Sequence, residues 1–146
     1  MPAKDVAVTA TYCHNHAGKL VISFRSDCVA HLDFLEIHGG ETSITSTAGQ
    51  GIYNSSINVY GGKLTVISEN DTNYSAINIM TKDFNIYGGK LFASCPNGEN
   101  VNAISGYVKS GTSKIKFYST DTEDQWGTGE VFSSNSVIHY KYVKAE

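Results

Sequence analysis

The sequence is poor in arginine, in proline and in long apolar runs. Its 146 residues include a single arginine and two prolines, and the formal net charge is −3. A nucleic-acid-binding protein needs a basic stripe against the phosphates, so we exclude nucleic acid as a partner. No run approaches the roughly 18 apolar residues of a membrane span, which excludes the membrane. Residues 1–16 also lack the basic start and apolar stretch of a secretory signal, so we expect an intracellular protein or a trimmed form of a secreted one.

The three cysteines, Cys13, Cys28 and Cys95, are few and scattered. Their number is odd and no CxxC pair occurs, which excludes a closed disulfide framework and a zinc site made of thiolates. We therefore expect at least one free thiol.

Helical periodicity is absent as well. Fourteen glycines accompany many Ile, Val, Tyr, Thr, Ser and Asn residues, which are the residue types of strands and turns. Apolar residues alternate with polar ones over short runs that Gly, Asn, Asp and Ser interrupt. The length is that of one domain, and we predict a single all-β domain spanning residues 1–146.

One phrase recurs along the chain. It reads INVYGGKLTVIS at residues 57–68 and FNIYGGKLFASC at residues 84–95. Related copies place a pair of small residues at positions 17–18, 39–40, 61–62, 88–89 and 110–111, with spacings of 22, 22, 27 and 22 residues. Repeats of this length, arranged end to end, are the signature of a solenoid whose unit is one supersecondary element.

The residues around each small pair indicate which solenoid forms. Alternating strands flank the pair, and a third short apolar element follows at positions 29–30, 51–52, 76–77 and 103–104. This is one coil of a single-stranded parallel β-helix, for which right-handed crossovers are the rule. We predict about five coils of 22–27 residues in 13–119, with capping strands in 1–12 and 120–146. The five extra residues of the longest coil should loop out on one face.

The same register predicts a row of outward side chains just before the corners. In the first two coils it brings together three imidazoles and a carboxylate, from His14, His16, Glu36 and His38. Such a group is suited to zinc, copper or nickel, so a transition-metal site is one hypothesis, and a metal-dependent enzyme built on it is a minor one. The alternative is two solvated rungs of histidine.

In the later coils the outward row consists of tyrosines and amides. We predict a ligand-binding face made of Tyr60, Tyr87, Tyr107, Asn58 and Asn85, with Lys63 and Lys90 just beyond the corners. Aromatic rings beside amides suit sugars, which offer CH groups to the ring and hydroxyls to the amides. Stacked tyrosines can also serve only to stabilise a ladder, and surface lysines only to balance charge.

Acidic residues gather in the loops, at positions 69, 71, 83, 99, 121, 123 and 124. Oxygen-rich loops can hold calcium, but the spacing matches no calcium-loop signature, which favours solvated loops. The sequence thus requires no cofactor, and calcium or a transition metal remain the candidates. No catalytic constellation recurs in the register, so we expect binding rather than catalysis.

The repeated phrases, the AIN and AIS between them and the closing VFSSNSVIHYKYVK carry a resemblance over residues 17–119. The chain resembles the bacterial carbohydrate-binding domain-containing proteins with short right-handed β-helices, related in shape to pectate lyases. This resemblance implies an extracellular polysaccharide-binding protein, with binding assisted by calcium and without established cleavage.

A different class of protein fits the sequence too. A small intracellular interaction protein, such as a phage-encoded inhibitor, could use a rigid β-helix as a flat docking face. The free thiols and the lack of a signal favour this hypothesis, and exposed tyrosines suit a protein interface as well as a sugar. The partner is therefore a polysaccharide or a protein. Exposed end coils could also pair two copies of the chain in a homodimer.

Overall fold

The computed structural model describes residues 13–24, 34–53, 55–70, 74–98, 101–110, 115–122, 125–127, 130–131, 136–137 and 140–146. This part of the chain contains strands and no helix, and hence no helix that could cross a membrane. The strands are β1 (Cys13–Asn15), β2 (Lys19–Phe24), β3 (Phe34–Ile37), β4 (Glu41–Ser46), β5 (Ile52–Tyr53), β6 (Ser56–Val59), β7 (Lys63–Ser68), β8 (Ile77–Asn78), β9 (Phe84–Ile86), β10 (Lys90–Ser94), β11 (Ile104–Ser105), β12 (Tyr107–Ser110), β13 (Lys116–Thr120), β14 (Glu130–Val131), β15 (Ser136–Val137) and β16 (Tyr142–Ala145).

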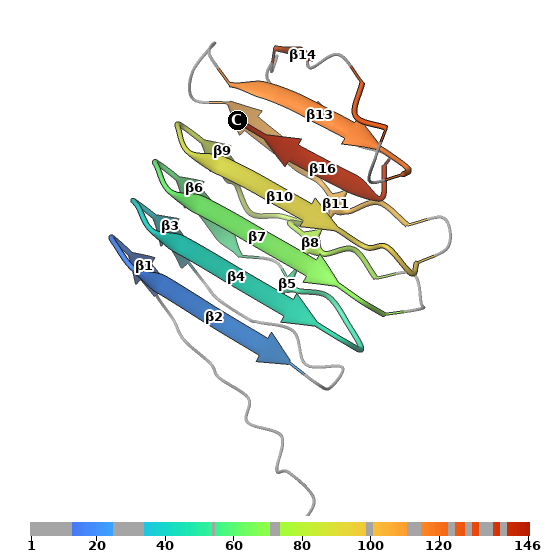
Figure 1. The fold of residues 1–146 in the computed structure, drawn as a ribbon, viewed down its shortest axis with the longest axis horizontal. Coiled ribbons are helices and arrows are strands. Elements are labelled where there is room, and N and C mark those ends of the chain that lie inside the picture. Colours follow the sequence, from blue (N-terminus) through green and yellow to red (C-terminus); the bar gives the residue numbers. More distant parts are fainter. Residues whose placement is uncertain are drawn as a thin grey trace, which may run out of the picture.

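Three sheets stack as a β-solenoid of about three turns (Figure 1). Sheet A has the order β1-β3-β6-β9-β12-β15, sheet B has the order β14-β13-β16-β10-β7-β4-β2, and sheet C has the order β11-β8-β5. Rungs pair in parallel from β1 to β12 in sheet A, from β2 to β10 in sheet B and throughout sheet C. The predicted all-β, parallel β-helical fold is therefore confirmed.

Glycine pairs make the corners between sheets A and B. The second glycine of each pair has a positive φ, for example 71° at Gly62, which side chains rarely adopt. The corners also touch: a Cβ on Gly62 would lie 2.5 Å from the carbonyl carbon of Gly39. The Lys63 amide donates to the Gly40 carbonyl at 2.9 Å, so one corner rests directly on the next. The repeated phrase is thus the sequence of a stacked corner.

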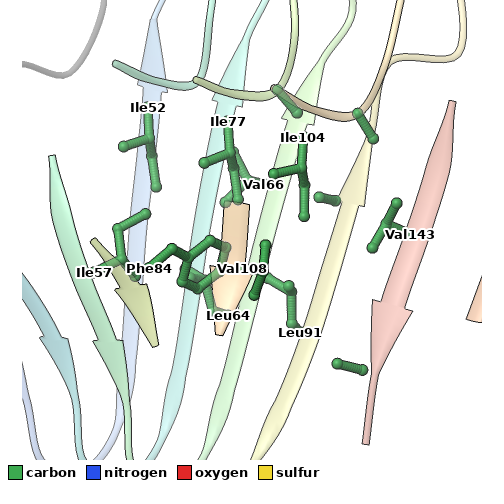
Figure 2. Packing of buried hydrophobic residues seen from close by; sticks show 14 of the residues in the cluster. Ile52, Ile57, Leu64, Val66, Ile77, Phe84, Leu91, Ile104, Val108 and Val143 are labelled. Carbon is green, nitrogen blue, oxygen red and sulfur yellow. The ribbon is translucent and has the colours of Figure 1, made fainter. Parts of the chain in front are cut away.

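The core is a set of apolar ladders inside the three sheets. Along β7 the side chains alternate, with Leu64 and Val66 buried and Lys63 exposed. Like positions pile up from turn to turn, and Figure 2 shows Ile52, Ile77 and Ile104 in one such row. These side chains are almost completely buried, which is the main source of stability in a solenoid whose turns contact only their neighbours.

The long coil loops out in two places. The register aligns Ser46 with Ser68 and Ile52 with Ile77, so the link between sheets B and C grows from 52 − 46 = 6 to 77 − 68 = 9 positions. From sheet C to sheet A the distance grows from 57 − 52 = 5 to 84 − 77 = 7 positions. The five extra residues are therefore divided, three in one loop and two in the other.

The last predicted coil differs from the prediction. The proposed corner at residues 110–111 would set Tyr107 opposite Asn85, whereas the structure pairs Lys109 with Asn85 and Ser110 with Ile86. The spacing to the preceding rung is therefore 108 − 84 = 24 residues, two more than expected. A shift of two positions keeps every side chain on its face, so alternation alone does not distinguish the two registers.

The solenoid has about three turns, where the sequence predicted about five coils. The C-terminal strands form antiparallel pairs instead of further parallel rungs. In sheet B the place beside β10 is taken by β16, which runs antiparallel to it, and β13 pairs with the far edge of β16. The antiparallel end of sheet B thus begins with β13 at Lys116, a few residues before the predicted boundary at 120. The predicted cap in 1–12 and the third element at 29–30 lie outside the described residues.

Candidate binding surface

Four aromatic side chains stack along one edge of the solenoid, each one residue before a corner. We call His16, His38, Tyr60 and Tyr87 the ring ladder. Their successive ring centroids are 4.7, 4.7 and 4.9 Å apart, and the ring planes are within 16° of parallel. The stacking follows from the parallel register of sheet A, which places equivalent residues directly above one another.

The two inner rings of the ladder, His38 and Tyr60, expose edges and polar tips rather than ring faces. Tyr60 is covered on both faces by His38 and Tyr87, yet it is 42% exposed. Tyr87 stacks on Tyr60 and is no more exposed, at 41%. The predicted pairing of a sugar's CH face with Tyr60 is therefore not available without breaking the stack, and Tyr87 has one of its two faces taken by Tyr60. What the ring ladder as a whole offers to a ligand is a line of hydroxyl and imidazole groups.

A second line of polar groups runs beside the ladder on the outer face of sheet A. We call Glu36, Asn58, Asn85 and Lys109 the polar row, because the backbone register aligns them from β3 to β12. The Asn85 side-chain amide donates to the Asn58 side-chain oxygen at 2.9 Å. The two lines are joined at one end, where Nε2 of His38 lies 3.2 Å from a carboxylate oxygen of Glu36.

The environment of Tyr60 favours its neutral hydroxyl. Desolvation in the stack raises the pKa of Tyr60 above its usual value of 10.0, and the nearby Glu36 carboxylate and Tyr87 raise it further. The hydroxyl therefore remains a hydrogen-bond donor and acceptor at neutral pH.

Tyr107 lies apart from the ring ladder. It is 56% exposed and borders a hollow of about 430 Å³ at the end of the polar row. We call this the Tyr107 hollow, and its lining residues are Ile79, Met80, Lys82, Asp83, Tyr107 and Lys109. Inside it the Lys109 ammonium donates to the Asp83 carboxylate at 2.7 Å. The structure thus separates Tyr107 from the tyrosines with which the sequence grouped it.

Lys63 and Lys90 lie across the corners, on the outer face of sheet B. They are register neighbours and line a second hollow, of about 240 Å³, together with Thr65, Phe92, Lys144 and others. The Lys90 ammonium lies 3.4 Å from the Glu146 carboxylate. These lysines therefore belong to a different surface from the ring ladder.

The predicted metal ligands are not assembled into a metal centre by the described side chains. His16 and His38 stack face to face, so their nitrogen lone pairs, which lie in the ring planes, do not converge on one point. The backbone of His14 pairs with Glu36, but its side chain lies outside the described ones. Among the side chains that are described, no three His, Cys, Asp or Glu residues are arranged to hold a metal ion.

The acidic loops and the cysteines are only partly described. Asp71, Glu99, Glu123 and Asp124, considered above for calcium, lie outside the described residues. Asp83 is inside them and pairs with Lys109. Cys95 is a free, fully buried thiol, as expected for at least one cysteine, and burial raises its pKa to about 11.

Sequence reasoning missed the part that Met80, Lys82 and Asp83 play in one hollow with Tyr107. The signal for it was the extra length of the 27-residue coil, because two of the five added residues fall between β8 and β9, where these side chains lie. Added length that the rungs do not need is typical of loops that carry function.

No family model, no curated protein and no solved structure matches this chain.

Proposed function

We propose that this protein is a non-catalytic binding module that holds an extended polysaccharide along the outer face of sheet A. The ring ladder and the polar row form the binding strip. This proposal extends the sequence-based hypothesis, but it assigns hydrogen bonding rather than ring stacking to Tyr60 and Tyr87.

The periodicity of the strip carries the proposal. The rings that carry the imidazole and hydroxyl groups recur with centroid spacings of 4.7 to 4.9 Å along the ladder, and amides from Asn58 and Asn85 run beside them. A line of similar donors and acceptors fits a ligand that itself repeats, and polysaccharides repeat their hydroxyl groups along an extended chain. Because the strip is built on paired strands, its groups are held in place before the ligand binds, which lowers the entropic cost of binding.

A protein partner is the second candidate. The specific observation in its favour is that Tyr60 and Tyr87 are each about two-fifths exposed although they stack on one another, and exposed tyrosines are enriched in protein interfaces. Such a partner would bury the ring ladder without needing its periodicity.

The test measures the binding of purified protein to a panel of insoluble polysaccharides and, by affinity electrophoresis, to soluble ones, with and without calcium. The informative variant is Tyr60→Phe with Tyr87→Phe, which removes both hydroxyls and keeps the stack. Two lost hydrogen bonds should weaken binding about tenfold. The matched control is Thr65→Ala on the outer face of sheet B, which should bind like the unmodified chain.

The outcomes separate the two candidates. Binding that falls in the double Tyr→Phe variant and persists in the Thr65→Ala variant supports the polysaccharide strip. The absence of binding to every polysaccharide would reject it, and the protein candidate would then be tested by the effect of Asn58→Ala with Asn85→Ala on a captured partner.

A further inference from the structure

The Tyr107 hollow contains an open aromatic side chain at the end of the binding strip. Among the described residues, Tyr107 has no ring stacked on it, whereas each ring of the ladder covers its neighbour. Its exposed fraction of 56% exceeds that of Tyr60 or Tyr87. Tyr107 is therefore the most exposed tyrosine of this surface, and among the described residues neither of its faces carries a stacked ring.

The bend before β12 fixes where Tyr107 stands. Gly106 has a φ of 120°, and a Cβ there would lie 3.0 Å from the Cβ of Ile79. The Ile79 amide donates to the Ser105 carbonyl at 2.9 Å, which binds the same two segments together. Tyr107 is thus held beside the loop between β8 and β9 by a backbone conformation at Gly106 that favours glycine and by close contact with Ile79.

The facing loop is shaped by a tight turn. The Lys82 amide donates to the Ile79 carbonyl at 3.0 Å, and Met80 between them has a φ of 48°. A residue with a side chain is uncommon in this left-handed region and costs conformational energy. The contacts around the turn therefore hold Met80 in a backbone conformation that it does not favour. It places Met80, 60% exposed, at the rim and Asp83 directly before β9.

The charged groups of the hollow are the Asp83 carboxylate, the Lys109 ammonium that pairs with it, and the Lys82 ammonium. One oxygen of Asp83 accepts from Lys109 at 2.7 Å, and the Asp83 side chain is 65% exposed. A carboxylate has about four lone-pair positions, so Asp83 has capacity for further donors such as ligand hydroxyls. A ligand carboxylate would meet Asp83 as a like charge. The remaining acceptor positions of Asp83 favour a polyhydroxylated ligand that is neutral where it meets this carboxylate.

The other hollow is less suited to this role. Two of its three lysines already have partners, since Lys90 pairs with Glu146 and Lys144 lies 4.8 Å from the ring centroids of both Tyr118 and Trp126. It also lies on sheet B, away from the polar row. The Tyr107 hollow instead continues that row, because Lys109 is the register neighbour of Asn85.

We propose that the Tyr107 hollow is the anchoring subsite for one neutral hexose unit of the polysaccharide. The CH face of the sugar packs on the ring of Tyr107, Asp83 accepts hydrogen bonds from its hydroxyls, and Lys109 holds the carboxylate in position. This inference rests on the proposed function and adds the class of sugar and its point of attachment.

The test compares the affinity of four single variants for the neutral polysaccharide that the unmodified chain binds best. Tyr107→Phe keeps the ring and should bind within about twofold, whereas Tyr107→Ala removes it and should lose about tenfold or more. Asp83→Asn should also lose several-fold. The matched control is Tyr140→Ala, since Tyr140 is similarly exposed, at 42%, and does not line the hollow.

Each result supports or overturns the inference. If Tyr107→Ala and Asp83→Asn both bind as tightly as the unmodified chain, the hollow is not a subsite, although the binding strip stands. If Tyr107→Ala fails to fold, Asp83→Asn alone decides, because its side chain is largely exposed and its replacement spares the fold. Preference for a uronate polymer over neutral chains would overturn the sugar class. The absence of binding to any polysaccharide overturns the proposed function itself and the subsite with it.

Discussion

Single glycines decide whether the corners of this solenoid can stack. Gly62 combines a φ of 71° with backbone contacts that leave no room for a Cβ. Gly18 has a φ of 90°, but a Cβ there would meet no atom within 4 Å. Both glycines thus have a positive φ, but only Gly62 is also crowded by neighbouring atoms.

We predict that Gly62→Ala lowers the free energy of unfolding by roughly 3 kcal/mol or more, because it adds a steric clash to conformational strain. Gly18→Ala, the matched control, should cost only the strain, about 1 kcal/mol. Urea denaturation of both variants measures the difference. Equal losses at the two positions would contradict the stacked-corner explanation.

The buried thiol of Cys95 makes stability depend on pH in the alkaline range. Burial raises its folded-state pKa from 9.0 to about 11, while the charge of Lys141 acts in the opposite direction. The folded state therefore holds the thiol proton more tightly than the unfolded state does. This contribution is complete below pH 9 and is lost as the pH rises toward 11.

The prediction is that the unfolding free energy of the unmodified chain falls from pH 9 to 11 more steeply than that of Cys95→Ala, which has no proton to lose there. Denaturation midpoints at several pH values measure both curves, and the variant corrects for lysines and tyrosines that titrate in the same range. Parallel curves would show that the thiol is not protected by the fold.

At the scale of the element, the ring ladder links successive rungs of sheet A. Tyr60 and Tyr87 stack at 4.9 Å, while His38 and Tyr87 lie on opposite faces of Tyr60, which separates them. The ladder should therefore stabilise the fold through neighbouring pairs only.

A double-mutant cycle on Tyr60→Ala and Tyr87→Ala should give a coupling energy of about 0.5–1 kcal/mol. The same cycle on His38→Ala and Tyr87→Ala is the control and should give less than about 0.5 kcal/mol. Chemical denaturation of the single and double variants supplies both values. A coupling for Tyr60 and Tyr87 no larger than the control would mean that the stack contributes nothing to stability.

The rungs themselves were predictable from the sequence because they obey two simple rules. Period-two alternation places Ile57, Val59 and Leu64 inside, and the glycine pairs place the corners, which together fix the register of four successive rungs. The next rung was misplaced by two residues because this shift leaves Val108 buried in either register. Only the length of the preceding loop distinguishes them, and loop length is weakly constrained by sequence pattern.

The candidate site was predictable to the same extent. The stacking of Tyr60 on Tyr87 and the contact of Asn58 with Asn85 follow directly from the register. The covering of both ring faces of Tyr60 could not be predicted in this way. The sequence shows which residues point outward but does not determine their side-chain rotamers. The Tyr107 hollow depends on both the shifted rung and the loop turn at Met80, which lie beyond pattern reasoning.

At the scale of the whole molecule, the end of the solenoid in sheet B is closed by a reversal of strand direction. Strand β16 runs antiparallel between β10 and β13 and covers the edge that the parallel ladder would otherwise present (Figure 1). An uncovered edge of this kind pairs with edges of other molecules.

We predict that a chain ending at residue 140, which lacks β16, self-associates through the edge of β10. Size-exclusion chromatography with light scattering should show larger species than for the full chain at the same concentration. Lys144→Ala is the control, because it keeps the strand and its backbone pairing and should behave like the full chain. A truncated chain that is folded and no larger than the control would show that β16 is not needed to protect this edge.

The central claim is that sheet A presents a binding strip for a polysaccharide, and NMR titration tests it most directly. The side-chain amide signals of Asn58 and Asn85 should shift together as a neutral oligosaccharide is added, while backbone signals of Thr65 and Phe92 on sheet B stay in place. Saturable binding that moves the sheet B signals and leaves both asparagine amides unchanged would contradict the claim, as would the absence of any shift with every oligosaccharide tested.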